Sequence, residues 1–139
     1  MMKVSDCQFI KNDYSFPELL PQIQSGKKVV LYGAGTAPSS YARIAIPAFR
    51  SFGIEPTAFV DDDLDRQGEE FLGIKVEPPS YIESLGSDAM VFLSSNYFES
   101  IARTIKTIGK IENIYSCTGI LRAVSEDAYS EVMSFEEVQ

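Results

Sequence analysis

A short apolar run that breaks into two glycines constrains this chain more than any other feature. Residues 29–32 read Val-Val-Leu-Tyr, and Gly33, Gly35 and helix-compatible sequence follow directly. Glycines in such a turn let the backbone bend sharply and let a ligand approach the main chain closely. The unpaired N–H groups and the positive dipole end of the next helix then face that ligand. The pattern predicts a strand, a turn and a helix that together bind phosphate.

Strand-like apolar runs alternate with helix-like stretches along the rest of the chain. The connections between the strands are too long for hairpins, which favours a parallel sheet with right-handed crossovers. The predicted fold class is therefore α/β, a three-layer Rossmann-like parallel sheet flanked by helices, with strand order 3-2-1-4-5. The predicted strands are 29–32, 56–60, 73–76, 89–93 and 111–115, and the predicted helices are 15–25, 37–52, 81–85 and 96–109.

Two local patterns refine the predicted helices. Ser15 and Glu18 have the Ser-x-x-Glu spacing of a capping box, so we expect their side chains to cap the first helix. Pro47 lies inside the second predicted helix, where proline removes a hydrogen bond and costs about 3 kcal/mol. We therefore expect a kink or a break near residues 44–46.

Length and composition fit one globular domain over residues 1–139, with a core at about 27–115. The chain is 45% hydrophobic and has no apolar run near the roughly 18 residues that a membrane span needs. Cys7 and Cys117 form no metal-binding or redox spacing, and the first residues show no signal-peptide pattern. We therefore expect a cytoplasmic protein.

The charge balance limits the partners. The net charge is −8, and the tail at 124–139 contains acids but no base. Such a charge repels nucleic acid and anionic lipid, so neither is an expected partner. A small phosphorylated ligand remains compatible, because main-chain amides can outweigh a distant field that salt screens over about 10 Å.

The turn and the end of the second predicted strand have the spacing of a dinucleotide site. The fingerprint Gly-x-Gly-x-x-Gly precedes, by about 20 residues, an acid that holds ribose hydroxyls. Here Gly33-x-Gly35-x-x-Pro38 is followed 23 residues later by Asp61. Proline at the third glycine position weakens the match to a standard nicotinamide or flavin site. Asp61 or Asp62 is the expected ribose contact.

Polar residues after the fourth predicted strand complete the candidate site. They open the next predicted helix at the carboxyl edge of the sheet, where open α/β sheets bind ligands. A purely structural alternative is that Asn96 only caps that helix. Beside the ribose contact, we expect Asp63 or Asp65 to cap the turn after the second strand. The candidate binding residues are Gly33, Ala34, Gly35, Thr36, Asp61, Asp62, Ser94, Ser95 and Asn96.

Familiar metal and catalytic patterns are missing from the sequence. The chain has no histidine, which is the commonest nitrogen ligand of zinc and the usual proton shuttle. A calcium loop counted from Asp63 would need glutamate at its twelfth position, which is Ile74. The sequence also has no Tyr-x-x-x-Lys, Gly-x-Ser-x-Gly or Walker motif. We expect no metal, and whether the chain catalyses a reaction stays open.

The chain also resembles a known group of proteins through five segments: 28–35, Gly53-Ile54, 59–63, Gln67-Gly68 and 71–76. These resemble the small Rossmann-type modules of bacterial sugar-modifying and polysaccharide-biosynthesis proteins. Such modules include the N-terminal domains of sugar acyltransferases and sugar dehydratases, and segments attached to FkbM-type methyltransferases. The resemblance covers about residues 27–115. It implies a phosphate turn at 33–35, a ribose or sugar contact at Asp61 or Asp62, and NAD(P) or a nucleotide sugar as ligand.

Three functions stay open at this point. The first is a nucleotide, nucleotide-sugar or NAD(P) binding module in surface sugar metabolism that works with a catalytic partner protein or as a homo-oligomer. The second is a fragment of an NAD(P)-dependent oxidoreductase or epimerase. The third is a degenerate Rossmann domain that only mediates protein contacts.

Overall fold

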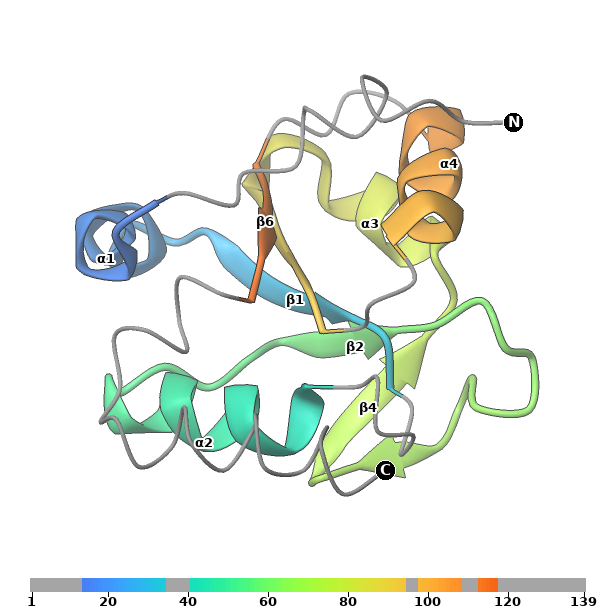
Figure 1. Ribbon diagram of the computed structural model, residues 1–139, viewed down its shortest axis with the longest axis horizontal. Helices are drawn as coiled ribbons and strands as arrows, with labels where there is room; N and C mark the ends of the chain where they lie inside the picture. Colours follow the sequence, from blue (N-terminus) through green and yellow to red (C-terminus); the bar gives the residue numbers. More distant parts are fainter. Residues whose placement is uncertain (1–13, 35–40, 95–97, 109–112, 118–139) are drawn as a thin grey trace.

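A six-stranded sheet forms the centre of the fold in the computed structural model (Figure 1). The structure describes residues 14–34, 41–94, 98–108 and 113–117. Neighbouring strands pair in parallel, except for one antiparallel pair at an edge, β3 with β4. Across the sheet the strands are β3 (Glu70–Phe71), β4 (Ile74–Glu77), β2 (Ala58–Val60), β1 (Lys28–Tyr32), β5 (Ala89–Leu93) and β6 (Ile114–Ser116).

The predicted α/β class is confirmed, and the order differs in one detail. The five predicted strands correspond to β1, β2, β4, β5 and β6, and they lie in the predicted order. The additional strand, β3, joins β4 through a two-residue turn. Leu72 and Gly73 both have positive φ values in this turn, 54° and 81°, as the tightest hairpins require. The antiparallel edge strand was not predicted.

Helices cover both faces of the sheet because successive strand residues point to opposite sides. Leu31 of β1 packs in one apolar cluster with residues of α1 and α2, whereas Val30 packs in the other with residues of α3 and α4. Figure 1 shows α2 and α4 on opposite sides of the sheet. No helix in the described ranges is long and apolar enough to cross a membrane. The helices are α1 (Phe16–Gln24), α2 (Ala42–Ser51), α3 (Ser80–Leu85) and α4 (Phe98–Ile108), with a short 3₁₀ turn at Gly86–Asp88.

One prediction about the helices is wrong, and another is wrong in part. The Ser15 side chain makes no capping hydrogen bond, and the first turn of α1 instead begins with a main-chain bond from Glu18 N–H to the Ser15 carbonyl. A kink or a break was expected near residues 44–46; there is no break, since α2 runs from Ala42 to Ser51 through Pro47, and the kink stays a prediction. Pro47 and Arg43 lie one turn apart and are both exposed. Water can therefore hydrate the carbonyl that proline leaves without a donor.

Candidate functional site

The carboxyl ends of three neighbouring strands are level with one another. Tyr32 of β1 pairs in register with Val60 of β2 on one side and with Leu93 of β5 on the other. The next residues, Gly33, Asp61 and Ser94, therefore meet at one edge of the sheet. Strand order also reverses here, since β2 lies on one side of β1 and β5 on the other. In open α/β sheets this is the edge at which ligands bind, and it is where the sequence predicted the candidate residues.

Two main-chain amides of the glycine turn are already paired within the chain. Gly33 N–H donates to the Val60 carbonyl at 2.9 Å. Ala34 N–H donates to Asp61 Oδ2 at 2.9 Å. Neither amide is therefore free to bind phosphate without giving up an internal partner. The predicted phosphate contact falls to the residues after Ala34, and these lie outside the described residues.

Asp61 links the turn after β1 to the loop after β2. Its Oδ2 accepts from Ala34 N–H, and its Oδ1 accepts from the main-chain N–H of Asp63 at 2.9 Å. The Gln67 side-chain amide donates to the Asp61 carbonyl at 2.9 Å. Each carboxylate oxygen can accept about two hydrogen bonds, and Asp61 is only partly buried. Asp61 therefore has a structural role and still has acceptor capacity for a hydroxyl group.

The loop after Asp61 is capped by an acidic side chain of the loop itself. Asp63 Oδ1 accepts the main-chain N–H of Asp65 at 2.9 Å, so of the two residues predicted to cap this turn, Asp63 or Asp65, Asp63 does so. The side chains of Asp62, Asp63 and Asp65 are exposed. In the part of the chain that the structure describes, no group of three or more acids or cysteines is arranged to hold a metal ion.

Ser94 holds the ends of β1 and β5 together. It has 0% exposure. Its hydroxyl lies 2.7 Å from the Gly33 carbonyl and 3.0 Å from the Tyr32 carbonyl, so it can donate to either. Its carbonyl accepts the Tyr41 N–H at the start of α2 at 2.7 Å. The observed role of Ser94 is structural, and direct contact with a ligand stays a prediction.

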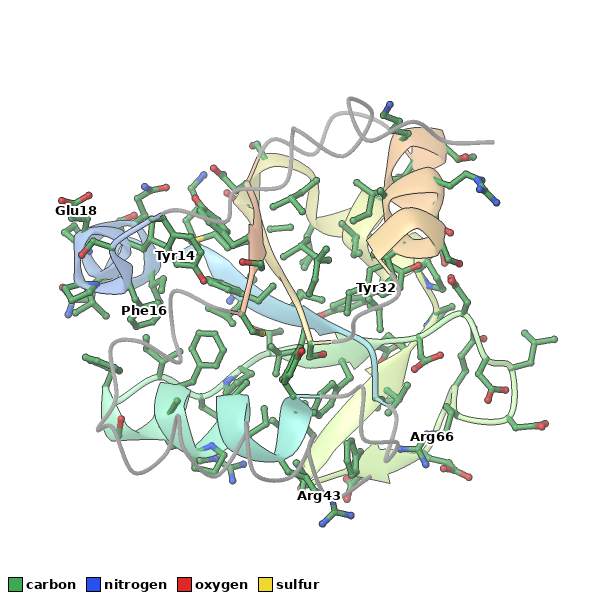
Figure 2. The ribbon with its side chains drawn as sticks, viewed as in Figure 1. Tyr14, Phe16, Glu18, Tyr32, Arg43 and Arg66 are labelled. Atoms are coloured by element: carbon green, nitrogen blue, oxygen red, sulfur yellow. The ribbon has the colours of Figure 1, made fainter. Side chains whose placement is uncertain are left out.

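Tyr32 connects this edge to the face that carries α4. Its ring is almost completely buried, and its hydroxyl donates to Asp62 Oδ1 at 2.6 Å. Burial, and then the hydrogen bond to Asp62, raise the pKa of the phenol well above its ordinary value, while a hydrogen bond from Thr104 of α4 lowers it in part. The phenol therefore stays protonated and acts as the donor. Figure 2 shows Tyr32 on the side of the sheet that carries α4.

Two arginines lie on the α2 side of the same edge (Figure 2). The Arg66 guanidinium donates to the Ala34 carbonyl and lies 3.5 Å from a Glu69 oxygen. It also lies 5.1 Å from the centre of the Phe71 ring, and the Arg43 guanidinium lies 5.8 Å from the same ring. The buried Nε of Arg66 has no hydrogen-bond partner among the described residues. Arg66 therefore fastens the turn after β1 to the loop after β2.

Sequence reasoning missed both Tyr32 and Arg66. The sequence pattern indicates only that Tyr32 is the last residue of an apolar strand. A signal for Arg66 was present, since it is the only base in the acidic segment 61–70. Four predicted site residues lie outside the described residues: Gly35, Thr36, Ser95 and Asn96. Ligand contact by any of the nine candidates stays a prediction.

The fold and this edge define a class of protein. A mostly parallel sheet between helices, with the strand order reversing beside a glycine turn, is a Rossmann-like α/β domain. More particularly, a family model described as C2185-like, N-terminal, matches residues 25–114. The match spans well over half of the chain, and the chain belongs to this family.

Comparison with solved structures finds a further similarity. The chain is similar to the crystal structure of UDP-D-quinovosamine 4-dehydrogenase from Vibrio fischeri, with 25% identity over 65% of this chain and 75% of that one. The TM-score of this pair is 0.37. The comparison with curated proteins gave no match.

Proposed function

We propose that this chain is a binding module for a nucleotide, a nucleotide sugar or NAD(P), and that it works with a catalytic partner protein in sugar metabolism. The observation that carries the proposal is the position of Asp61 and Asp62. They follow β2 directly, level with the glycine turn, and Asp61 is hydrogen-bonded to that turn. In Rossmann-like sheets, a carboxylate at this position accepts the hydroxyls of a ribose.

We expect the same edge to offer acceptors for the hydroxyls of the ligand and main-chain amides for its phosphates. Asp61 keeps acceptor capacity on both oxygens after its two internal bonds. Asp62 is exposed, and only its Oδ1 is bonded among the described residues. In this proposal the phosphates are held by main-chain amides beyond Ala34, where the sequence places Gly35 and Thr36.

A second candidate is a Rossmann-like domain that has lost its ligand and mediates protein contacts. Its specific support is the internal pairing of the Gly33 and Ala34 amides. Pro38 at the third glycine position agrees with it. In this case Asp61 acts as an internal anion that replaces a phosphate.

A panel of ligands separates the two candidates. Thermal unfolding would be followed with UDP-sugars, NAD(H), NADP(H) and S-adenosylmethionine over a range of concentrations. A ligand at 100 times its dissociation constant stabilises its protein by about 2.7 kcal/mol. We expect a saturable rise in the melting temperature with a nucleotide-containing ligand. No shift with any member of the panel would favour the degenerate domain.

A charge introduced into the turn provides the matched control. Gly35→Asp places a carboxylate in the predicted phosphate turn and is expected to abolish the shift. Ser87→Asp adds the same charge to an exposed residue just before β5, at the opposite end of the strands. It is expected to leave the shift unchanged. Equal losses in both variants would mean that the effect is one of net charge.

A further inference from the structure

Tyr32 is a buried side chain with one polar contact to the candidate site. It is the last residue of β1, and its exposure is 1%. Its ring packs on the α3 and α4 side of the sheet with apolar residues such as Val60 and Ile101. A phenylalanine would make the same apolar contacts. The hydroxyl is therefore the part of Tyr32 that packing alone does not explain.

The hydroxyl holds an exposed carboxylate in one orientation. It donates to Asp62 Oδ1 at 2.6 Å, the short distance typical of a bond to an ionised oxygen. Asp62 itself is exposed, and an exposed side chain without such a bond samples several rotamers. With Oδ1 fixed, Oδ2 is the oxygen that remains available. It has no partner among the described residues.

Asp61 and Asp62 thus differ in what binds them. The two oxygens of Asp61 are anchored by main-chain N–H groups of Ala34 and Asp63. Among the described residues, Asp62 is anchored only by the side chain of Tyr32, which packs on the face of the sheet that carries α3 and α4. Asp61 stabilises the turn after β1. The orientation of Asp62 depends on the hydroxyl of Tyr32, which a single substitution can remove.

We propose that Tyr32 is a positioning residue, and that its hydroxyl orients Asp62 to accept a hydroxyl of the ligand's ribose. The inference rests on the proposed function and adds a residue and a specificity to it. A carboxylate fixed in advance binds a hydroxyl without losing rotamer freedom at that moment. The ligand class favoured is a ribonucleotide with both ribose hydroxyls free.

The test compares ligands with and without those hydroxyls. Dissociation constants would be measured by calorimetry for UDP, ADP and their 2′,3′-dideoxy forms. The wild type is expected to prefer the ribose forms by about 10- to 100-fold, the range for a hydrogen bond to a charged group. Asp62→Asn is expected to reduce this preference towards one. Tyr32→Phe is expected to reduce it several-fold, with no further loss in the double variant.

Affinity for the dideoxy forms distinguishes positioning from a general structural role. It is expected to stay within about twofold in Tyr32→Phe, whereas general damage to the site would weaken all ligands together. Asp88→Asn is the matched control, since Asp88 is exposed just before β5, at the far end of the strands. It is expected to bind every ligand as the wild type does.

The outcomes separate the two proposals. If the wild type binds UDP or ADP but Tyr32→Phe keeps the full preference for ribose, Tyr32 is not a positioning residue and the proposed function stands. If the wild type binds none of these nucleotides or the wider panel, the proposed function fails and this inference fails with it. Asp62→Asn changes only an exposed side chain. An unchanged preference there overturns the inference even if Tyr32→Phe proves unstable.

Discussion

The carboxylate of Asp61 stabilises the fold through two internal hydrogen bonds, with or without a ligand. Asp61→Asn leaves one acceptor oxygen for two donors, Ala34 N–H and Asp63 N–H. One of these loses its partner, so we expect unfolding by urea to require about 1–3 kcal/mol less free energy. Asp65→Asn is the control, because the exposed carboxylate of Asp65 accepts no hydrogen bond from any of the described residues. It should change stability by less than about 0.5 kcal/mol. Equal effects would show that Asp61 does not hold the turn.

Because the thiol of Cys117 is buried, we expect the free energy of unfolding to depend on pH in the alkaline range. Burial raises the pKa of its thiol from 9.0 to about 12. Between these values the unfolded chain loses a proton that the folded chain keeps, so the free energy of unfolding falls as pH rises. One such group contributes at most about 1.4 kcal/mol per pH unit. The contribution of the protonated Cys117 thiol to the free energy of unfolding is fully present below pH 9 and is lost as the pH rises towards 12.

The variant Cys117→Ala isolates this contribution. Urea unfolding of both proteins at pH 8, 9, 10 and 11 should give a shallower decline for the variant. Other ionising groups, including Tyr32, contribute equally to both curves. Parallel declines would mean that Cys117 is accessible enough to ionise in the folded state.

At the scale of secondary-structure elements, the sequence predicted what depends on local pattern. The run 89–93 is continuously apolar, and β5 has those bounds and is buried along its whole length. The glycine turn and the acids after β2 were placed at one edge because parallel strands end together. Local sequence pattern indicates less clearly which residues support the candidate site. Tyr32 and Arg66 act through partners 30 and 32 residues away, and such contacts exist only after the chain folds.

The errors at this scale have physical causes. The strand β3 is only two residues long, and it forms because Leu72 accepts a positive φ beside Gly73. No hydrophobic alternation can appear over such a length. The break at Pro47 was expected from propensity, which tertiary packing overrides. Ala45, Ile46, Ala48 and Phe49 around it are all buried.

Pro47 should therefore cost stability without breaking the helix. Pro47→Ala restores an N–H donor for the Arg43 carbonyl, and we expect unfolding to cost about 1 kcal/mol more, less than the full penalty of about 3 kcal/mol. Pro17→Ala is the matched control, since Pro17 is exposed in the first turn of α1, where proline lacks no needed donor. Chemical denaturation of both variants tests this. A Pro47→Ala protein no more stable than Pro17→Ala would show that α2 has no missing bond to restore.

At the scale of the whole molecule, the negative net charge of the protein opposes the binding of an anionic ligand at the candidate site. The net charge is −8, and the loop at 61–70 adds acids beside the candidate site. A ligand that carries a diphosphate approaches against this field. The basic residues at this edge, Arg43 and Arg66, lie beside Phe71, and Arg66 is already bonded to the turn. Main-chain amides, which carry no net charge, are left as the expected phosphate partners.

This opposition predicts an unusual salt dependence. Raising ionic strength from 0.02 to 0.2 M shortens the screening distance from roughly 20 Å to about 7 Å. Repulsion between the protein and UDP or ADP then weakens, while short contacts to amides are little affected. We expect affinity to stay level or rise up to several-fold over this range, measured by calorimetry in NaCl. A steep fall would show that cationic side chains dominate binding. Arg43→Gln, which removes an exposed arginine outside the turn, would then reduce the fall.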